Sequence, residues 1–282
     1  MAHIWVNDVL MNRAEASIDP EDRGYQFGDG VYEVVKVYEG NLFEMEAHID
    51  RFYRSADELR IVIPYTKDVL HKMVYDIVEA DQLQTGHVYM QITRGVAPRQ
   101  HYFPDEASAT FTAYTQVSER PYENFERGIK ALLHEDIRWL RCDIKSLNLL
   151  GAVLAKQAAH EANCDEAILH RGDVVTEGSS SNVYGIKDGV MYTHPANNFI
   201  LNGITRQVVL RCAEEIQLPV VEEAMTVEQL LAMDEVIYTS TGAEVTPIVQ
   251  INEQLIHKGV RGEWTKKLQE VFESKVQAAI TI

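Results

Sequence analysis

The amino-acid sequence predicts a mixed α/β protein of the α+β type, with two lobes that meet near residue 120. Its 282 residues exceed the ~100–200 residues of a typical domain. Runs of β-branched and aromatic residues are interspersed with segments of helical hydrophobic spacing, which indicates strands and helices in both halves. Between the halves, composition turns polar around a proline in Ser118–Pro121. We therefore expect a smaller N-terminal domain over residues 1–118, a linker over 119–122 and a larger C-terminal domain over 123–282.

Composition and charge exclude several classes of function. The chain carries 26 basic and 43 acidic residues, a net charge of −17, so its surface repels phosphate backbones and anionic lipids. We expect neither nucleic-acid nor membrane binding. The amino terminus lacks a basic lead and a sustained apolar core, and the apolar run Leu149–Ala155 is far shorter than the ~20 residues of a spanning helix. Three scattered cysteines are too few for a disulfide framework or a zinc site, which favours a reduced, cytoplasmic setting.

In the first half, a hairpin and two helices are expected. Val31–Tyr38 and Asn41–Glu44 flank a turn at Glu39-Gly40, the pattern of a β-hairpin. Apolar residues at positions 49, 52, 56 and 59 then predict a helix that ends before Pro64. A second helix is expected over Asp68–Ala80, followed by strands over His87–Thr93 and Thr110–Thr115.

In the second half, short strands joined by glycine turns are expected, with helices between them. Thr226–Gln229 has the pattern of a capping box that opens a short helix. The other expected elements are, in order, strand Gly128–His134, helix Asn148–Ala162, strands Glu166–His170, Val174–Thr176, Asn182–Ile186 and Val190–Thr193, helix Ile204–Gln217, strands Glu235–Thr239 and Pro247–Ile251, and helix Glu263–Ile280.

Common catalytic motifs are absent from the sequence. Ten histidines are present, but none stands in H-E-x-x-H or at ligand spacing from cysteine, so we expect no metal. Gly178–Asn182 lacks the second glycine of a nucleophile elbow. Gly28–Gly30 precedes a strand and lacks the third glycine of a dinucleotide loop. Metal, serine-hydrolase and phosphate-loop chemistry are all disfavoured.

Lys145 is the most unusual candidate, because it stands beside apolar residues just before an expected helix. An arbitrary lysine in such a place is usually a solvated residue near a helix start. A lysine held in apolar surroundings, however, loses proton affinity, as an amine nucleophile that forms an imine requires. Lys145 is therefore a candidate nucleophile.

Further residues would complete a site for an aromatic aldehyde with a ring nitrogen and a phosphate. Glu177 could hold such a nitrogen protonated. Gly203–Arg206 opens an expected helix, whose free N–H groups and dipole favour a phosphate. Ser240–Gly242 could supply hydroxyl and amide donors to the same anion, and Arg51 a charge-assisted hydrogen bond. Each signal is weak alone, and together they indicate one ligand.

Over essentially its whole length the sequence resembles the D-amino-acid aminotransferases of fold type IV. This pyridoxal-phosphate class also contains branched-chain aminotransferases and aminodeoxychorismate lyases. The resemblance implies a two-domain fold type IV enzyme, whose larger C-terminal lobe holds a barrel-like sheet. The stretches that carry it are Asp22–Glu33, His48–Arg51, Ile144–Gly151 and Thr176–Asn182.

The resemblance also implies the cofactor and the residues that hold it. Lys145 would bond covalently to pyridoxal 5'-phosphate, and Glu177 would face the pyridine nitrogen. The other implied cofactor-binding residues are Arg51, the backbone of Ile204 and Thr205, Ser240 and Thr241 around the phosphate, Leu201 on one face of the ring, and Ser180 and Ser181 nearby.

Similar enzymes are homodimers in which a loop from the partner subunit closes the site. That loop matches Arg99–His101, and with Tyr32 its Arg99 and His101 would hold the substrate α-carboxylate. The implied activity is transfer of an amino group from a D-amino acid such as D-alanine to a 2-oxo acid such as 2-oxoglutarate or pyruvate, with ping-pong kinetics through pyridoxamine phosphate.

Alternatives stay open at this point. An L-branched-chain aminotransferase or an aminodeoxychorismate lyase would share fold and cofactor, and Thr241–Glu244 resembles both branches. A cofactor-binding or structural protein without activity is a further alternative.

Overall fold

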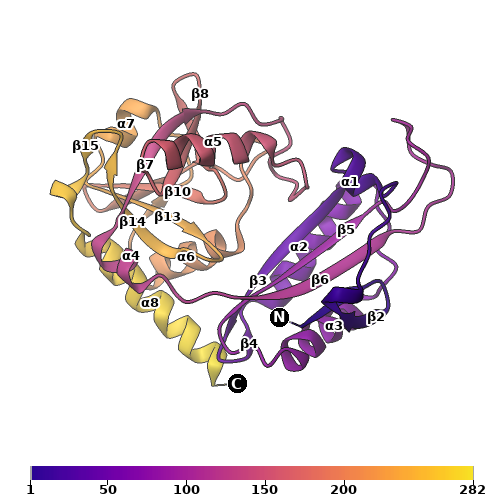
Figure 1. Ribbon diagram of the computed structural model, residues 1–282. Helices are drawn as coiled ribbons and strands as arrows, with labels where there is room; N and C mark the ends of the chain where they lie inside the picture. Colours follow the sequence, from indigo (N-terminus) through magenta and orange to yellow (C-terminus); the bar gives the residue numbers. More distant parts are fainter. Residues whose placement is uncertain (1, 282) are drawn as a thin grey trace. The chain divides into compact units, whose positions relative to one another are not determined.

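The computed structural model describes residues 2–281, and their contacts group them into two compact units (Figure 1). Unit 1 contains the chain through Glu119, the segment Ile144–Asn148 and the end of the chain from Ala278. Unit 2 contains Arg120–Asp143 and Leu149–Gln277. The segment with Lys145 therefore belongs to unit 1, although it follows the expected linker. The two units are therefore not two continuous halves of the chain, as a single linker at residues 119–122 would give.

Unit 1 is built on a six-stranded sheet with its helices on one face. The strand order is β2-β1-β6-β5-β3-β4, with β1 His3–Val6, β2 Val9–Asn12, β3 Gly30–Tyr38, β4 Asn41–Leu42, β5 Gly86–Thr93 and β6 Thr110–Val117. The helices are α1 Arg23–Phe27, α2 Met45–Glu58 and α3 Lys67–Ala80, with a 3₁₀ turn at Arg13–Glu15.

The core of unit 1 follows from strand alternation and helical spacing. Val31, Val35 and Val37 on β3 point to the same face and are completely buried. They pack in one cluster with Ile49 and Phe52 of α2 and with the apolar face of α3. At ~25 cal/mol per Å², such burial is the main stabilising contribution.

The segment that carries Lys145 adds to the edge of this sheet. Ser146 forms an antiparallel bridge with Val31, and the N–H of Tyr32 donates to the carbonyl of Lys145 at 3.0 Å. The N–H of Leu147 donates to the Gly30 carbonyl at the same distance. The backbone of Lys145 is thus fixed by the strand that also carries Tyr32.

Unit 2 is built on a nine-stranded, mixed sheet of half-barrel form. The order is β12-β11-β10-β13-β14-β7-β8-β9, and β15 pairs with β14. The strands are β7 Ile129–Glu135, β8 Glu166–Arg171, β9 Val174–Gly178, β10 Asn182–Lys187, β11 Val190–Thr193, β12 Val220–Val221, β13 Glu235–Ser240, β14 Glu244–Ile251 and β15 Gln254–Leu255.

Five α-helices accompany this sheet in the described residues, and the last residues of the fifth, from Ala278, belong to unit 1. They are α4 Tyr122–Arg127, α5 Leu150–Glu161, α6 Ile204–Glu215, α7 Val227–Leu231 and α8 Glu263–Ile280, with a 3₁₀ turn at His257–Gly259. The predicted capping box is present, because Thr226 and Gln229 each bind the other's backbone N–H. The bounds of α8 are those predicted.

The mixed α/β class and most of the predicted elements are confirmed. Sequence analysis missed the β1–β2 hairpin, α1, α4, β12 and β15. The missed helices have five and six residues, and the missed strands two to four. Elements this short have too few residues to show a hydrophobic period.

Candidate active site

The predicted site residues are divided between the two units. Unit 1 holds Lys145, Tyr32, Arg51, Arg99 and His101. Unit 2 holds Glu177, Ser180, Ser181, Leu201, Ile204, Thr205, Ser240 and Thr241.

The side chain of Lys145 lies over an aromatic ring. Its Nζ is 4.4 Å from the centre of the Tyr32 ring, while its backbone N–H lies 3.3 Å from Ser55 Oγ of α2. No hydrogen bond or ion pair to this amine is found among residues 2–281. Ile144, the residue before it, is buried. The backbone of Lys145 is therefore fixed, while its Nζ is free of hydrogen bonds and ion pairs within the described residues.

Arg51 is held by a buried carboxylate. Its Nε and Nη2 donate to the two oxygens of Glu33 at 2.7 and 2.9 Å, and the ring Nδ1 of His48 lies 2.7 Å from Glu33 Oε2. Burial opposes ionisation of Glu33, which has no exposed surface, yet the charges of Arg51 and His48 keep its pKa below the ordinary value. In His48, burial has the opposite effect and lowers the pKa of the ring, against the raising effect of the Glu33 carboxylate. Sequence analysis assigned Arg51 but not the two residues that fix it.

The loop with Arg99 and His101 rests on α1. The Arg99 guanidinium lies 4.9 Å from the centre of the Phe27 ring, and the His101 ring lies 5.5 Å from it. Arg23, which is almost fully buried, donates to the Gln100 carbonyl at 2.6 Å. Arg99 and His101 are both exposed, and within the described chain no hydrogen bond joins either side chain to Tyr32. The structure brings these two residues together but not onto Tyr32.

Glu177 is a buried carboxylate with three N–H donors. Arg138 Nη1 donates to Oε1 at 2.6 Å, whereas Asn182 Nδ2 and the backbone N–H of Leu201 each donate to Oε2 at 3.0 Å. Burial raises the pKa of Glu177 to about 7, against the lowering effect of Arg138 and of the Leu201 N–H. Such a carboxyl group can gain or release a proton near neutral pH.

Asn182 connects Glu177 to the start of α6. Its Nδ2 also donates to the Leu201 carbonyl at 2.8 Å. A Cβ at Gly203 would approach Asn182 Oδ1 to 2.3 Å, so only glycine fits at this position. The glycine therefore permits the close approach that fixes Glu177 and Leu201 beside the first turn of α6.

The amino-terminal end of α6 has the properties of an anion site. Its N-cap, Gly203, provides no side-chain cap, while Ile204 and Thr205 are buried. The first N–H groups of a helix lack intrahelical partners and carry positive potential. Thr239 of β13 pairs with Asn182, the first residue of β10, and Ser240 ends β13. Ser240 and Thr241 therefore lie at the end of the sheet where Asn182 lies.

Of the predicted serines, one is buried and one exposed. Ser181 Oγ donates to Glu166 Oε2 at 3.2 Å, and Ser179 Oγ donates to Glu166 Oε1 at 2.5 Å. Ser180, between them, is exposed. Glu166 therefore fixes the turn from β9 to β10 and leaves Ser180 outward.

Two residues of this unit escaped sequence analysis, Asp136 and Arg138. Asp136 receives Arg138 Nε and Nη2, each at 2.9 Å, and so directs the guanidinium whose Nη1 reaches Glu177. A charged pair at i and i+2 after a strand was the only local signal, and such pairs are common on surfaces.

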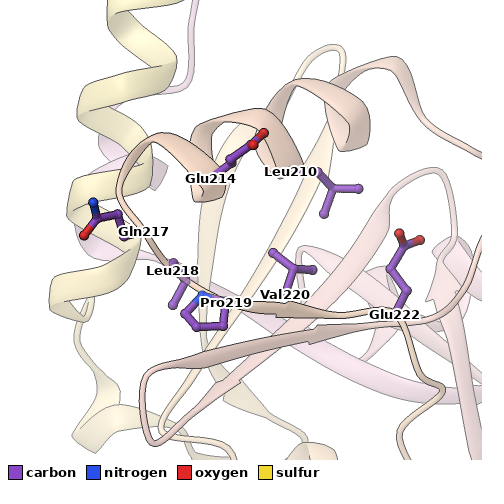
Figure 2. A pocket seen from close by; sticks show the side chains of 7 residues that line it. All are labelled: Leu210, Glu214, Gln217, Leu218, Pro219, Val220 and Glu222. Atoms are coloured by element: carbon purple, nitrogen blue, oxygen red, sulfur yellow. The ribbon is translucent and has the colours of Figure 1, made fainter.

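A groove of about 460 Å³ in unit 2 contains none of the predicted site residues (Figure 2). Leu210 and Glu214 of α6 lie on one side of it, opposite Pro219 and Val220. Glu222 lies at one end, where its Oε2 accepts from buried Arg206 at 2.5 Å. In residues 2–281, moreover, no three acidic, histidine or cysteine side chains are grouped to hold a metal ion.

Comparison with known proteins identifies the family. Residues 30–251 match the family described as amino-transferase class IV. The chain therefore belongs to the class IV aminotransferases, which depend on pyridoxal phosphate.

Within that family, the chain is similar to D-alanine aminotransferases over nearly its full length. It is 50% identical over 279 residues to the enzyme of Staphylococcus epidermidis, with 99% of both chains covered. It is 49% identical over 279 residues to that of Listeria innocua, covering 98% of this chain and 96% of the relative. Among solved structures, the branched-chain aminotransferase of Thermoproteus uzoniensis with norvaline has a TM-score of 0.90 at 26% identity, covering 98% and 95% of the two chains. The predicted fold type is confirmed.

Proposed function

We propose that the protein is a D-amino-acid transaminase, which moves the amino group of a D-amino acid such as D-alanine to a 2-oxo acid such as 2-oxoglutarate. The observation that carries this proposal is the Lys145 amine over the Tyr32 ring, in a chain about half identical to D-alanine aminotransferases. Two half-reactions on one site correspond to ping-pong kinetics.

The residues present fit pyridoxal 5'-phosphate. Lys145 supplies an amine, Glu177 a buried carboxyl group for a ring nitrogen, and the uncapped start of α6 an anion site. When bound, the cofactor supplies an electron sink for negative charge at the substrate Cα.

Each residue of this chain then has a defined task. Lys145 removes the proton at Cα of the amino donor and, in the second half-reaction, delivers a proton to Cα of the new amino acid, because a free amine at that position is a competent base. Glu177 holds a proton at the ring nitrogen, for which a pKa of about 7 suits it.

The other residues of unit 2 bind and orient the cofactor. The N–H groups of Ile204 and Thr205 would bind its phosphate together with Ser240 and Thr241, and Arg51 of unit 1 is a further phosphate ligand that the family resemblance implies. Leu201, whose backbone is fixed by Glu177 and Asn182, would pack on the ring. Ser180 and Ser181 would lie near cofactor and substrate, Ser180 with its side chain exposed and Ser181 held by Glu166.

The substrate α-carboxylate would be held by Tyr32 of one subunit and by Arg99 and His101 of the other. The exposure of the last two, and the absence of a hydrogen bond from either to Tyr32 within the described chain, agree with a role in a second subunit of a homodimer. We propose a cytoplasmic location, which the few scattered cysteines favour. Within residues 2–281 no helix is both long and apolar enough to cross a membrane.

The test is the visible absorbance of the purified enzyme before and after addition of D-alanine or L-leucine. Bleaching of the cofactor band by D-alanine alone would support cofactor, half-reaction and stereochemistry together. Loss of the response in Lys145→Ala tests the lysine, and its retention would refute that assignment. A protein that acquires no visible band with added cofactor would overturn the proposal.

A second candidate is an L-branched-chain aminotransferase, because solved structures of very similar fold carry that name. Their identity to this chain is 26–28%, against 49–50% for the D-alanine enzymes. Bleaching by L-leucine alone would favour this candidate while leaving Lys145 and Glu177 in their roles.

A further inference from the structure

Glu177 stands at the end of a row of alternating charges inside unit 2. Arg171 Nε donates to Asp136 Oδ2 at 3.1 Å. Asp136 accepts Nε and Nη2 of Arg138, and Arg138 Nη1 continues to Glu177. The Asp136 side chain has no exposed surface, and that of Arg138 is 11% exposed. Water therefore screens these charges poorly.

The division of the Arg138 guanidinium between two carboxylates is unequal. Asp136 accepts the two-pronged edge of the guanidinium and also the backbone N–H of Arg138 at 3.1 Å. Glu177 receives one N–H. A carboxylate that holds an arginine edge by two parallel bonds is stabilised as an anion more than one that holds it by a single bond.

The position of Asp136 is itself fixed independently of the Arg138 guanidinium. Thr176 Oγ1 donates to Asp136 Oδ2 at 2.9 Å, and Thr176 precedes Glu177 on β9. Arg171 is anchored by the carbonyls of Arg138 and Trp139. The aspartate is thus clamped from β8 and β9 and cannot follow Arg138 toward Glu177.

The remaining groups around Glu177 add no charge near neutral pH. Burial raises the pKa of the Cys142 thiol to about 11. Burial also keeps the pKa of the Tyr184 phenol, on β10, above its ordinary value. Asn182 and the Leu201 N–H are neutral donors. Arg138 and Asp136 are therefore the charges through which the protein sets the proton affinity of Glu177.

We propose that Asp136 is a positioning residue that keeps Glu177 able to hold a proton, by retaining the two-pronged edge of Arg138. Without it, that edge turns to Glu177 and stabilises the carboxylate as an anion. The inference rests on the proposed function, in which Glu177 serves the ring nitrogen of the cofactor, and it extends that function to a residue that touches neither cofactor nor substrate.

The test follows the protonation of Glu177 by infrared spectroscopy of the full chain with ¹³C-labelled glutamate. The Glu177 band is identified by its loss in Glu177→Gln, and it is titrated with and without pyridoxal phosphate. In Asp136→Asn we expect the titration midpoint to fall by roughly one pH unit, the size of effect that a neighbouring charge commonly produces. Asp136→Glu, which restores the charge, should return the midpoint part of the way.

A variant of opposite sign keeps the test decisive if Asp136→Asn folds poorly. Arg171→Gln removes a cation from Asp136 at a side chain that is 20% exposed. The negative charge of Asp136 then acts more strongly, so the Glu177 midpoint should rise. Opposite shifts in the two variants support the proposal, and an unchanged midpoint in the variants that fold overturns it.

Glu235→Gln is the matched control for loss of a buried carboxylate. Glu235 accepts the N–H groups of Trp264 and Thr265 at the start of α8. Its replacement should lower the melting temperature and leave the Glu177 midpoint unchanged, whereas a shift equal to that of Asp136→Asn would reduce Asp136 to a structural role.

Failure of the inference can be told from failure of the proposed function. If Glu177→Gln leaves turnover and the cofactor spectrum unchanged, the role of Glu177 itself is refuted. If Glu177→Gln impairs both while Asp136→Asn leaves the Glu177 midpoint in place, only the role of Asp136 is refuted.

Discussion

At the scale of single residues, Glu177 shows how burial and hydrogen bonding oppose each other. Burial favours its neutral form, and three N–H donors favour its anion, so its pKa lies near 7 instead of at either extreme. A glutamine at this position keeps the size and one acceptor but has no proton to exchange.

We expect Glu177→Gln to slow removal of the substrate α-proton by roughly 10²–10⁴-fold, the range of general acid–base contributions. The rate can be measured by rapid mixing with D-alanine and with D-alanine deuterated at Cα. A rate equal to that of the parent enzyme would contradict the role of Glu177.

Glu33 is the second residue-scale case, because it is fully buried beneath Arg51 and His48. Removing one partner of a buried pair commonly costs roughly 3–5 kcal/mol of unfolding free energy. In Glu33→Gln we also expect weaker binding of pyridoxal phosphate, while binding of pyridoxal, which lacks the phosphate, stays the same. Equal losses for both ligands would show that Glu33 only stabilises the fold.

Thr226→Ala is the control for that measurement. It removes the capping box of α7 and should lower the unfolding free energy by about 1 kcal/mol. Neither ligand should bind it differently from the parent enzyme.

The predicted residues and the missed ones differ in how local their signals are. Lys145 and Glu177 stand in segments whose resemblance to a family is visible in the sequence, and their roles stay predictions. Asp136 and Arg138 are two residues apart, but the contact of Arg138 with Glu177 and that of Asp136 with Thr176 depend on β7, β8 and β9 lying side by side. Such long-range pairing has no local sequence signature.

At the scale of elements, α1 has a role that its five residues do not suggest. Asp22 caps it through the Gly24 N–H, and Gly28 ends it with a φ of 67°, where glycine is favoured. Its Phe27 ring supports both Arg99 and His101. The helix thus holds the loop that carries the proposed carboxylate-binding pair.

We expect Phe27→Leu to raise the KM for D-alanine about tenfold and to change kcat less. Ring contacts of this kind contribute about 0.5–1.5 kcal/mol each, and 1.4 kcal/mol corresponds to a factor of ten. Tyr25→Leu on the same helix, at a side chain that is 80% exposed, is the matched control and should leave KM unchanged. An equal effect of the two changes would argue against a specific support.

The elements that sequence analysis found are those whose period could be counted. The 14 residues of α3 show a buried stripe at Leu70, Met73, Val74 and Ile77, and its start was predicted to within one residue. The extra strand-like pairing of Ile144–Asn148 with β3 was not predicted. Its residues satisfy no strand period by themselves, and the pairing joins positions more than a hundred residues apart.

At the scale of the whole molecule, two effects act on stability as pH rises through neutrality. The net charge is −17 with all histidines neutral and is less negative at lower pH, so self-repulsion of the folded chain increases as the pH rises. Buried carboxyl groups contribute separately. Salt distinguishes the two, because it screens exposed charges and leaves buried ones nearly unaffected.

For the buried groups, the direction of the pH effect depends on the sign of each shift. Glu33 and Asp136 have lowered pKa values, that of Asp136 about 2, so their contribution is present at neutral pH and is lost as the pH falls below about 4. Glu177 has a raised pKa, from 4.5 to about 7, so the folded chain binds more protons than the unfolded one within that interval. Its contribution to stability therefore falls as pH rises from about 4.5 to 7.

We accordingly expect the cofactor-free chain to be most stable near pH 5. Its unfolding free energy should fall by about 2 kcal/mol between pH 5.0 and 7.5 on account of Glu177, since one pKa unit corresponds to 1.36 kcal/mol and the rest of the loss falls outside this interval. Urea unfolding at pH 5.0 and 7.5, each at low and high salt, measures the fall. The part that persists in high salt should disappear in Glu177→Gln, because glutamine does not titrate. A fall of the same size in that variant would show that other groups cause the pH dependence. It would contradict the prediction that titration of Glu177 changes the unfolding free energy.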